Sequence, residues 1–280
     1  MAEILKGAPV AAAITEDLKK RCAVLAEKGI TPKAAIIRVG DKPDDLSYER
    51  AALKRFDSLG IAVSQFVMPE DCTENMLIEA IEKINSDKSI HGALMFRPLP
   101  DRKMQNRITD LLDPAKDIDG MTSISLAGVF TGNNTGFPPC TARAVIELCD
   151  HYGIDPAGKE AVVIGRSLVI GRPLSMMLQR RNATVTMCHT ATRDLAAICR
   201  RADIIVSTAG HSGIVTEECV REGQIVIDVG VCVNDEGKIT GDVDFDPVSR
   251  IVAAITPVPG GVGAITTAVL AKHVVMGLSQ

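Results

Sequence analysis

Apolar positions in the first part of the chain follow two alternating periods. Segments with apolar residues three and four apart, the spacing of an amphipathic helix, are 9–28, 45–59 and 74–85. Short apolar runs, which are typical of buried strands, lie at 34–39, 61–68 and 90–96. Gly29 and Gly60 are placed to end the first two helices, and Thr73 is placed to cap the third. This rhythm predicts a mainly parallel sheet with helices on both of its faces.

The middle of the chain has little periodicity. Residues 113–140 are crowded with Asp, Gly, Asn, Thr and Pro, which predicts a long loop of the kind that usually has a function. A helix is predicted at 141–152, and a second alternating series follows. Its strands are expected at 161–164, 184–188, 204–207 and 225–229, and its helices at 171–181, 194–200, just after Thr216 and at 265–278. The pattern therefore predicts two α/β lobes divided near 145–155, with the last helix returning to the first lobe.

The composition is that of an ordinary globular chain. Of its 280 residues, 46% are hydrophobic and 24% are charged, which excludes wholesale disorder. The 31 Lys and Arg against 35 Asp and Glu give a net charge of −4, and the basic residues are scattered. Aromatic residues make up 3% and Trp is absent, so a platform for stacking bases is not expected either. We expect no nucleic-acid partner.

Membrane insertion, secretion and metal binding are not expected. The longest uncharged stretches, 120–142 and 251–271, are interrupted by Gly and Pro, so neither is a candidate membrane helix. The start of the chain carries Glu3 and Lys6 and only a short apolar run, which favours a cytoplasmic protein over a secreted one. The eight cysteines have neither CxxC spacing nor a His at metal-ligand spacing, so we expect reduced, mostly buried thiols.

A glycine-containing loop gives the strongest local signal. The apolar run Val162–Ile164 leads into Gly165, and Gly171 then opens a helix, with the spacing G-x-S-x-x-x-G. Such a strand–turn–helix lets backbone N–H groups face a phosphate, as in dinucleotide-binding folds. An ordinary β–α turn with structural glycines is the alternative. The position of the loop at the start of a new β-α series favours dinucleotide binding.

The charges near this loop favour NADP over NAD. An NAD site usually has an acidic residue at the end of the second strand, which holds the ribose 2′-hydroxyl. Here the second strand is followed by no acid before Asp194. Arg166 and Arg172 lie in the loop itself and could pair with a 2′-phosphate. NAD stays the alternative, because solvated arginines at a helix end would look the same in the sequence.

Several short stretches together resemble the methylenetetrahydrofolate dehydrogenase/cyclohydrolase family. They are 39–41 with Tyr48, 97–100, 116–120, 139–141, 165–173, 227–230, 241–243 and 256–263. They follow one another along nearly the whole chain. The runs Asp-Ile-Asp-Gly at 117–120 and Thr-Pro-Val-Pro-Gly-Gly-Val-Gly at 256–263 are the most specific.

The resemblance implies a fold, a reaction and an assembly. The family has two α/β domains that face each other across a cleft, which places a folate-binding catalytic domain at 1–145 and a Rossmann-type NAD(P)-binding domain at 146–263. The helix at 264–280 would pack back on the first domain. Family members oxidise methylenetetrahydrofolate to the methenyl form, and the bifunctional ones then hydrolyse that product. They are generally homodimers.

The resemblance also implies site residues. Tyr48 and Asp119 would be catalytic, with Tyr48 stacking on the folate ring and Asp119 hydrogen-bonding the pterin. The expected cofactor contacts are Gly165, Arg166, Ser167, Gly171, Arg172, Pro173, Thr190 and Val231. The expected substrate contacts are Tyr48, Phe96, Asp119, Pro259, Gly260, Gly261, Val262, Gly263 and Thr266.

Two family positions are occupied by other residues. The family has a Lys four residues after the Tyr and a Gln in a Val-Gln-Leu-Pro-Leu-Pro strand end, whereas this chain has Ala52 and Phe96. Lys54 is about 200° around the helix from Ala52, and Arg97 would point to the opposite face of a strand from Phe96. We therefore expect neither to act as a substitute without local rearrangement.

The departures predict a monofunctional NADP-dependent dehydrogenase. Hydrolysis of the methenyl group needs general acid–base groups, which Ala and Phe lack, whereas hydride transfer depends on alignment and on the cofactor. Three alternatives stay open: a bifunctional enzyme that uses Lys54 or Arg97, a related oxidoreductase with another substrate, and an inactive folate- or nucleotide-binding homologue.

Overall fold

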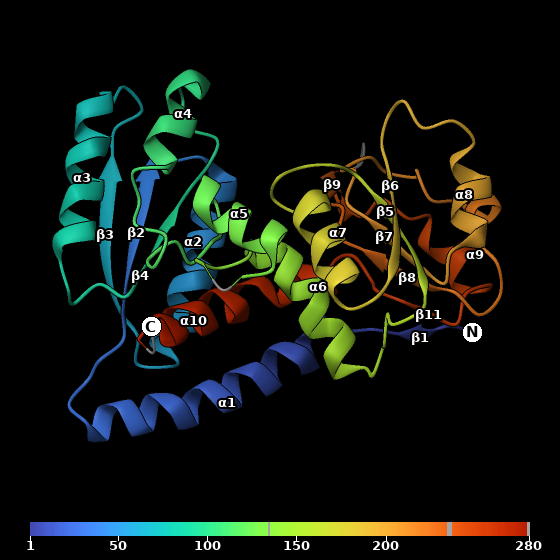
Figure 1. Cartoon of the computed structure of the whole chain (residues 1–280), viewed down its shortest axis with the longest axis horizontal. Coiled ribbons are helices and arrows are strands. Elements are labelled where there is room, and N and C mark those ends of the chain that lie inside the picture. The colour runs from blue at the N-terminus through green and yellow to red at the C-terminus, as the bar shows by residue number, and fades with distance from the viewer. Residues whose placement is uncertain (134, 234–236, 279–280) are drawn as a thin grey trace. The chain divides into compact units, whose positions relative to one another are not determined.

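The computed structural model of this chain describes residues 1–133, 135–233 and 237–278, and only the backbone of Asn106. Its contacts divide the chain into two units (Figure 1). Unit 1 comprises Met1–Ala12 and Thr141–Thr266, and unit 2 comprises Ala13–Cys140 and Thr267–Gln280.

Unit 2 is built on a three-stranded parallel sheet. Strand β2 (Lys33–Val39) lies between β3 (Ala62–Met68) and β4 (Gly92–Met95), and all but the first residue of β2 are buried. The helices that lie wholly in this unit are α2 (Pro43–Asp57), α3 (Glu74–Ser86), α4 (Arg102–Thr109) and α5 (Ser123–Thr131). Most of α1 (Gly7–Glu27) and of α10 (Thr266–Gly277) belongs to it as well. As the sequence predicts, Thr73 caps α3, because its side chain accepts a hydrogen bond from Met76 N.

The two faces of this sheet are covered by different helices. Ile37 of β2 and Met95 of β4 form one core cluster with Leu77 of α3 and Ile108 of α4. Gly92 of β4 is on the other face, where a Cβ would overlap Ile118 Cγ2 (2.3 Å) and contact Val274 (3.4 Å) of α10 (Thr266–Gly277). The close approach explains why glycine occupies this strand position.

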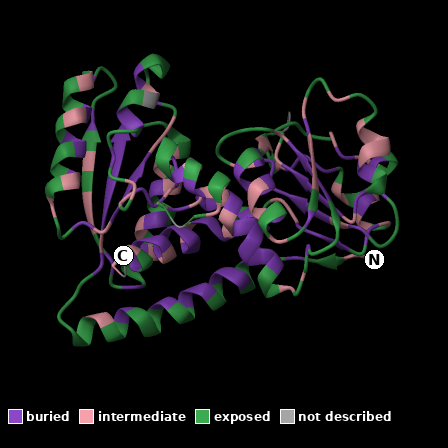
Figure 2. Cartoon of the chain, viewed as in Figure 1, coloured by how far each residue is buried: buried purple, intermediate pink, exposed green. Residues whose placement is uncertain are grey.

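Unit 1 contains a six-stranded parallel sheet in the order β1-β11-β8-β7-β5-β6. Its strands are β1 (Glu3–Ile4), β5 (Glu160–Ile164), β6 (Thr184–Cys188), β7 (Ile204–Ser207), β8 (Ile225–Asp228) and β11 (Ala254–Ile255). Its other elements are α6 (Cys140–His151), α7 (Gly171–Arg180), α8 (Leu195–Arg201), α9 (Phe245–Ser249), the short 3₁₀ helices η1 (Glu217–Cys219) and η2 (Val262–Ala264), and the hairpin of β9 (Cys232–Val233) with β10 (Ile239–Thr240). Strands β5, β7 and β8 are almost entirely buried, whereas the edge strands β1 and β6 are mostly exposed or half-buried (Figure 2).

The predicted α/β class with parallel sheets is confirmed, and the structure adds elements that the sequence pattern did not indicate. Helix α5 lies inside the segment 113–140, which was expected to be a loop, and it is capped by Thr122 and by Gly132. Residues Met1–Ala12 belong to unit 1, because β1 pairs with β11; α1 (Gly7–Glu27) then leads into unit 2. The predicted domain boundaries had assigned those residues to the first domain.

Two further findings concern the whole chain. The eight cysteines are unpaired, and all except Cys232 are buried, as expected. No helix in the described part of the chain combines the length and the apolar content needed to cross a bilayer.

Candidate active site

The loops that follow the strands of unit 1 meet at the carboxyl edge of its sheet. The glycine loop follows β5, Thr190 follows β6, and Val231 follows β8. The N–H of Gly165 donates to the carbonyl of Cys188 (2.9 Å), which joins the first two loops at their bases. Crevices outside the carboxyl ends of parallel strands are where α/β sheets bind ligands.

The two glycines of the loop are required by close packing. Gly165 has φ +121°, and a Cβ there would overlap Thr208 Oγ1. A Cβ at Gly171 would overlap the carbonyl oxygen of Gly165. Helix α7 therefore begins directly against the loop, and its N-cap Ile170 makes no side-chain capping bond. A tight glycine loop that leads directly into a helix N-terminus is the arrangement that dinucleotide-binding folds use for a phosphate group.

The remaining predicted cofactor residues surround this helix start. Arg166 and Arg172 are exposed, and neither takes part in an ion pair among the described residues. Ser167 Oγ accepts a hydrogen bond from Ile170 N (3.1 Å), and Pro173 is buried in the first turn of α7. Thr190 is exposed and Val231 is 65% exposed. Two arginines that form no ion pair among the described residues, beside a helix N-terminus, fit a dinucleotide with an additional phosphate.

Two buried aspartates brace the neighbouring loops. Asp228, at the end of β8, accepts hydrogen bonds from the backbone N–H groups of Gly230, Asp242 and Val243 (2.9–3.1 Å). Asp242 accepts from Ser207 Oγ and from the N–H groups of Ala209 and His211 (2.7–2.8 Å). Burial raises the pKa of Asp228 to about 6 against the effect of its backbone donors. These two side chains hold the backbone of the neighbouring loops in place through their hydrogen bonds.

The segment 256–263 is fixed to the start of the chain. Gly7 N donates to the carbonyl of Gly260 (2.8 Å), and a Cβ at Gly7 would overlap the Gly261 carbonyl. Pro259, Gly260 and Gly263 are exposed, whereas Gly261, Val262 and Thr266 are buried. Thr266 Oγ1 donates to the Gly263 carbonyl (3.1 Å). Of the predicted substrate contacts in this run, the exposed ones can meet a ligand without a rearrangement.

In unit 2, Tyr48 and Phe96 lie together at the carboxyl edge of the sheet. Their half-buried rings meet edge to face, with 6.0 Å between centroids. Tyr48 is on α2, and its neighbour Glu49 is buried and accepts a hydrogen bond from Arg38 Nε of β2 (2.7 Å). This buried ion pair ties the helix to the sheet and so fixes where the Tyr48 ring lies.

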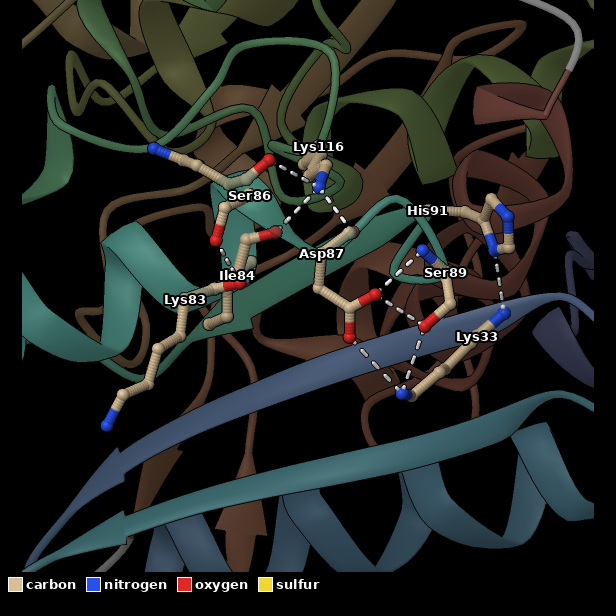
Figure 3. Close-up of polar contacts among 9 residues, drawn as sticks. Lys33, Lys83, Ile84, Ser86, Asp87, Ser89, His91 and Lys116 are labelled. Atoms are coloured by element: carbon tan, nitrogen blue, oxygen red, sulfur yellow. Dashed lines mark hydrogen bonds and ion pairs between the residues drawn. The ribbon is translucent and has the colours of Figure 1, made fainter.

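The run Lys116–Gly120 has three charged residues, two of which hold neighbouring backbone in place. Lys116 Nζ donates to the carbonyls of Ile84, Asn85 and Asp87 (2.6–2.9 Å) at the end of α3 (Figure 3). Asp117 is fully buried and accepts from Met121 N, Thr122 N and Ser125 Oγ (2.7–3.0 Å), which holds the start of α5. Only the third charge, Asp119, remains available for a ligand.

Asp119 forms an ion pair with Arg97. Arg97 Nη2 donates to Asp119 Oδ2 (3.1 Å), and the two side chains are 20% and 21% exposed. Burial raises the pKa of Asp119, Arg97 lowers it, and Asp117 adds to the rise. Burial also raises the pKa of the adjacent Cys140 thiol well above its usual value, so that thiol stays protonated.

Phe96 and Arg97, at the end of β4, have different partners in the structure. Strand β4 ends at Met95, so Phe96 and Arg97 lie beyond it and need not point to opposite faces. Phe96 contacts Tyr48, and Arg97 reaches Asp119. Lys54 is exposed on α2, whereas Ala52 is fully buried, in agreement with the helical rotation between them. Arg97 is thus the site residue that sequence reasoning set aside.

Comparisons with known proteins agree along the whole chain. Residues 5–119 match the family profile described as tetrahydrofolate dehydrogenase/cyclohydrolase, catalytic domain, and residues 139–280 match that family's NAD(P)-binding domain. The bifunctional protein FolD of Carboxydothermus hydrogenoformans is 50% identical over 277 residues, which are 98% of this chain and 96% of that protein.

Solved structures show the same similarity. The bifunctional enzyme FolD of Campylobacter jejuni has a TM-score of 0.97 at 39% identity, covering 100% of this chain and 99% of that chain. FolD of Trypanosoma brucei, solved as a complex with NADP and an inhibitor, has a TM-score of 0.93 at 33% identity, covering 99% and 97% of the two chains.

Proposed function

This chain belongs to the tetrahydrofolate dehydrogenase/cyclohydrolase family, and from that membership we propose that it oxidises 5,10-methylenetetrahydrofolate to the 5,10-methenyl form with NADP as acceptor. The observation that carries the proposal is the close-packed loop of Gly165 and Gly171 in unit 1, called the glycine cradle below. Beside it lie Arg166 and Arg172, which are exposed and form no ion pair among the described residues. NADP supplies the hydride-accepting chemistry when bound, so the protein has to bind and align the two ligands.

The dinucleotide is assigned to unit 1. Its phosphates would lie at the start of α7, against Gly165, Ser167, Gly171 and Pro173. The 2′-phosphate would pair with Arg166 or Arg172, and Thr190 and Val231 would line the neighbouring loops. The Trypanosoma relative, which binds NADP, supports this choice over NAD.

The folate is assigned to the edge of unit 2. Tyr48 would stack on the ring system, Phe96 would extend this apolar surface, and Asp119 would accept hydrogen bonds from the pterin. The segment Pro259–Gly263 and Thr266 are proposed as further substrate contacts. A homodimer and a cytoplasmic location stay predictions; light scattering of the purified protein tests the first.

Two versions of this function differ in the fate of the methenyl product. The bifunctional version, in which the product is also hydrolysed, is favoured by the relatives, because proteins that match this chain over 98% of its length are named bifunctional. The monofunctional version rests on Ala52 and Phe96, which offer no exchangeable proton. If hydrolysis occurs, Arg97 beside Asp119 is the better-placed basic residue, since Lys54 is exposed on α2.

Two assays test the function and separate its versions. Purified protein supplied with methylenetetrahydrofolate should reduce NADP; reduction of neither NADP nor NAD would leave the inactive homologue as the better reading. Decay of added methenyltetrahydrofolate is then followed by absorbance, with and without protein. Decay proportional to protein concentration identifies the bifunctional enzyme, and decay at the background rate identifies the monofunctional one.

A further inference from the structure

Arg97 occupies a position where the family's strand end, Val-Gln-Leu-Pro-Leu-Pro, has an aliphatic residue. The side chain is not on the surface: it is 20% exposed and paired with Asp119. Its Nε is buried and has no hydrogen-bond partner among the described residues. A buried guanidinium N–H without an acceptor is unfavourable, and native proteins rarely leave such a donor unsatisfied unless a ligand or water supplies the acceptor.

The ion pair leaves hydrogen-bonding capacity on both partners. A guanidinium has five N–H donors in one plane, and the contact to Asp119 is made through Nη2. A carboxylate has about four acceptor directions, so Asp119 can accept from a ligand while it holds Arg97. The pair therefore presents donors next to acceptors, in a place that is mostly shielded from water.

We propose that Arg97 and Asp119 together recognise the pyrimidine edge of the pterin ring, with Arg97 donating to its 4-oxo oxygen while Asp119 accepts from the adjacent N–H groups. The proposal rests on the proposed function, which supplies the folate. A 2-amino-4-oxopyrimidine presents two N–H groups next to a carbonyl oxygen, and the pair is complementary to that order. A leucine at position 97 cannot donate, so Arg97 adds a donor that the Val-Gln-Leu-Pro-Leu-Pro strand end lacks.

Arg97 has a second effect on the same contact. Burial raises the pKa of Asp119 and Arg97 opposes that rise, so the arginine favours the ionised form of the carboxyl, which is the form that accepts. Loss of Arg97 should move the protonation of Asp119 to higher pH. Folate binding would then weaken at a higher pH than in the unmodified protein.

The test is calorimetric titration with tetrahydrofolate between pH 5.5 and 8.5. Arg97→Leu should weaken binding about 10- to 100-fold, the range for a hydrogen bond to a charged group. In this variant the acid limb of the pH profile, where affinity for tetrahydrofolate falls as pH is lowered, should shift to higher pH. Arg97→Lys, which keeps the charge but not the planar donors, should keep the acid limb and lose only part of the affinity. Arg102→Leu, an exposed arginine in α4, is the matched control and should change neither.

The same variants are titrated with 6-methyltetrahydropterin, which lacks the benzoylglutamate, and with NADP. The Arg97→Leu effect should persist for the pterin and be absent for NADP. Equal tetrahydrofolate affinity in Arg97→Leu and the unmodified protein overturns the proposal. A loss of affinity seen with tetrahydrofolate but not with the pterin also overturns the proposal, because it would assign Arg97 to the glutamate. Absence of tetrahydrofolate binding by the unmodified protein overturns it as well. Binding without NADP reduction would contradict the proposed function alone.

Discussion

At the scale of single residues, Arg166 and Arg172 are the positions that bear most directly on the choice of dinucleotide. Both are exposed at the start of α7 and have no acidic partner among the described residues. Replacing either with Ala should raise the KM for NADP about 10- to 100-fold if it holds the 2′-phosphate, since a hydrogen bond to a charged group contributes about 1.5–3 kcal/mol. The KM for NAD should change little.

Arg180, exposed in the last turn of the same helix, provides the matched control. Arg180→Ala should leave both Michaelis constants unchanged. Equal increases for NADP and NAD in the Arg166 and Arg172 variants would assign these arginines to a part of the dinucleotide that the two cofactors share.

Positions 52 and 96 determine whether the site has acid–base groups for hydrolysis of the methenyl product. The double variant Ala52→Lys, Phe96→Gln should hydrolyse methenyltetrahydrofolate faster than the unmodified protein, because general acid–base groups contribute on the order of 10²- to 10⁴-fold. Ala52→Lys alone should do less, since Ala52 is fully buried and a lone ammonium beside Phe96 would lack a polar partner.

Absorbance decay at several protein concentrations measures the gain. Dehydrogenase activity in the same preparation controls for folding. Fast hydrolysis by the unmodified protein, with no gain in the double variant, would mean that the reaction does not need Lys and Gln at these two positions.

At the scale of elements, Lys116 stabilises the end of α3 (Figure 3). Its ammonium group donates to the backbone carbonyls of Ile84, Asn85 and Asp87, at a helix C-terminus where the last carbonyls have no partner within the helix. The Asp87 carbonyl also accepts from Ile90 N (3.1 Å). Lys116→Met should lower the free energy of unfolding by about 2 kcal/mol, given that Lys116 is only half-buried. Lys83→Met, at an exposed position in the last turn of α3, should change it by less than about 0.5 kcal/mol. Urea denaturation compares the two, and equal losses would contradict the capping role.

Asp228 gives unit 1 a defined pH dependence. Its pKa is raised to about 6 in the folded protein, so the folded state keeps this proton where the unfolded chain, with a pKa near 4, has lost it. The unfolded state therefore binds fewer protons in this window, and the free energy of unfolding should fall as pH rises from about 4 to about 6. In Asp228→Asn this contribution is absent. The free energy of unfolding of the unmodified protein minus that of Asp228→Asn should therefore decrease as pH rises from about 4 to about 6.

Urea midpoints at intervals between pH 4 and 7 measure that difference. Asp246→Asn, at an exposed position in α9, serves as the control and should give a constant difference. If the free energy of unfolding of the unmodified protein minus that of Asp228→Asn increases as pH rises, the sign of the pKa shift is contradicted.

The strands of this protein were predictable where the apolar runs are continuous. The predicted strand 184–188 coincides with β6 and the predicted strand 204–207 with β7. Every residue of β7 is buried, and a strand that is buried on both faces needs no alternation. Strands β1 and β11 were not predicted, since each has two residues and exists only through pairing between distant segments. Helix α5 was missed because its apolar residues do not mark its buried face: Ser125 and Gly128 are buried, whereas Ile124 and Phe130 are exposed.

The candidate site was predictable only in part, for a similar reason. Asp119 and the glycine loop follow from local motifs. The partnership of Arg97 with Asp119 depends on where β4 ends and on the turn that brings 118–120 against it, neither of which the sequence pattern fixes. The alternation of a strand describes where a side chain points, but it does not identify Asp119 as the partner of Arg97.

At the scale of the whole molecule, ligand binding and stability are linked. A ligand that binds only the folded protein adds about 2.7 kcal/mol of stability at one hundred times its Kd. For a chain of this size, NADP at that concentration should raise Tm by about 5–10 °C. NAD at the same concentration should raise it less, because it lacks the 2′-phosphate that Arg166 or Arg172 would hold.

Differential scanning fluorimetry over a series of nucleotide concentrations measures both increases, and the Arg166→Ala, Arg172→Ala double variant supplies the control. In that variant the NADP and NAD curves should nearly coincide, since the remaining contacts, those of the glycine cradle to the shared phosphates, are the same for both. A Tm that does not respond to NADP would contradict the assignment of the dinucleotide to unit 1, because a cradle that binds this ligand only in the folded state must stabilise that state.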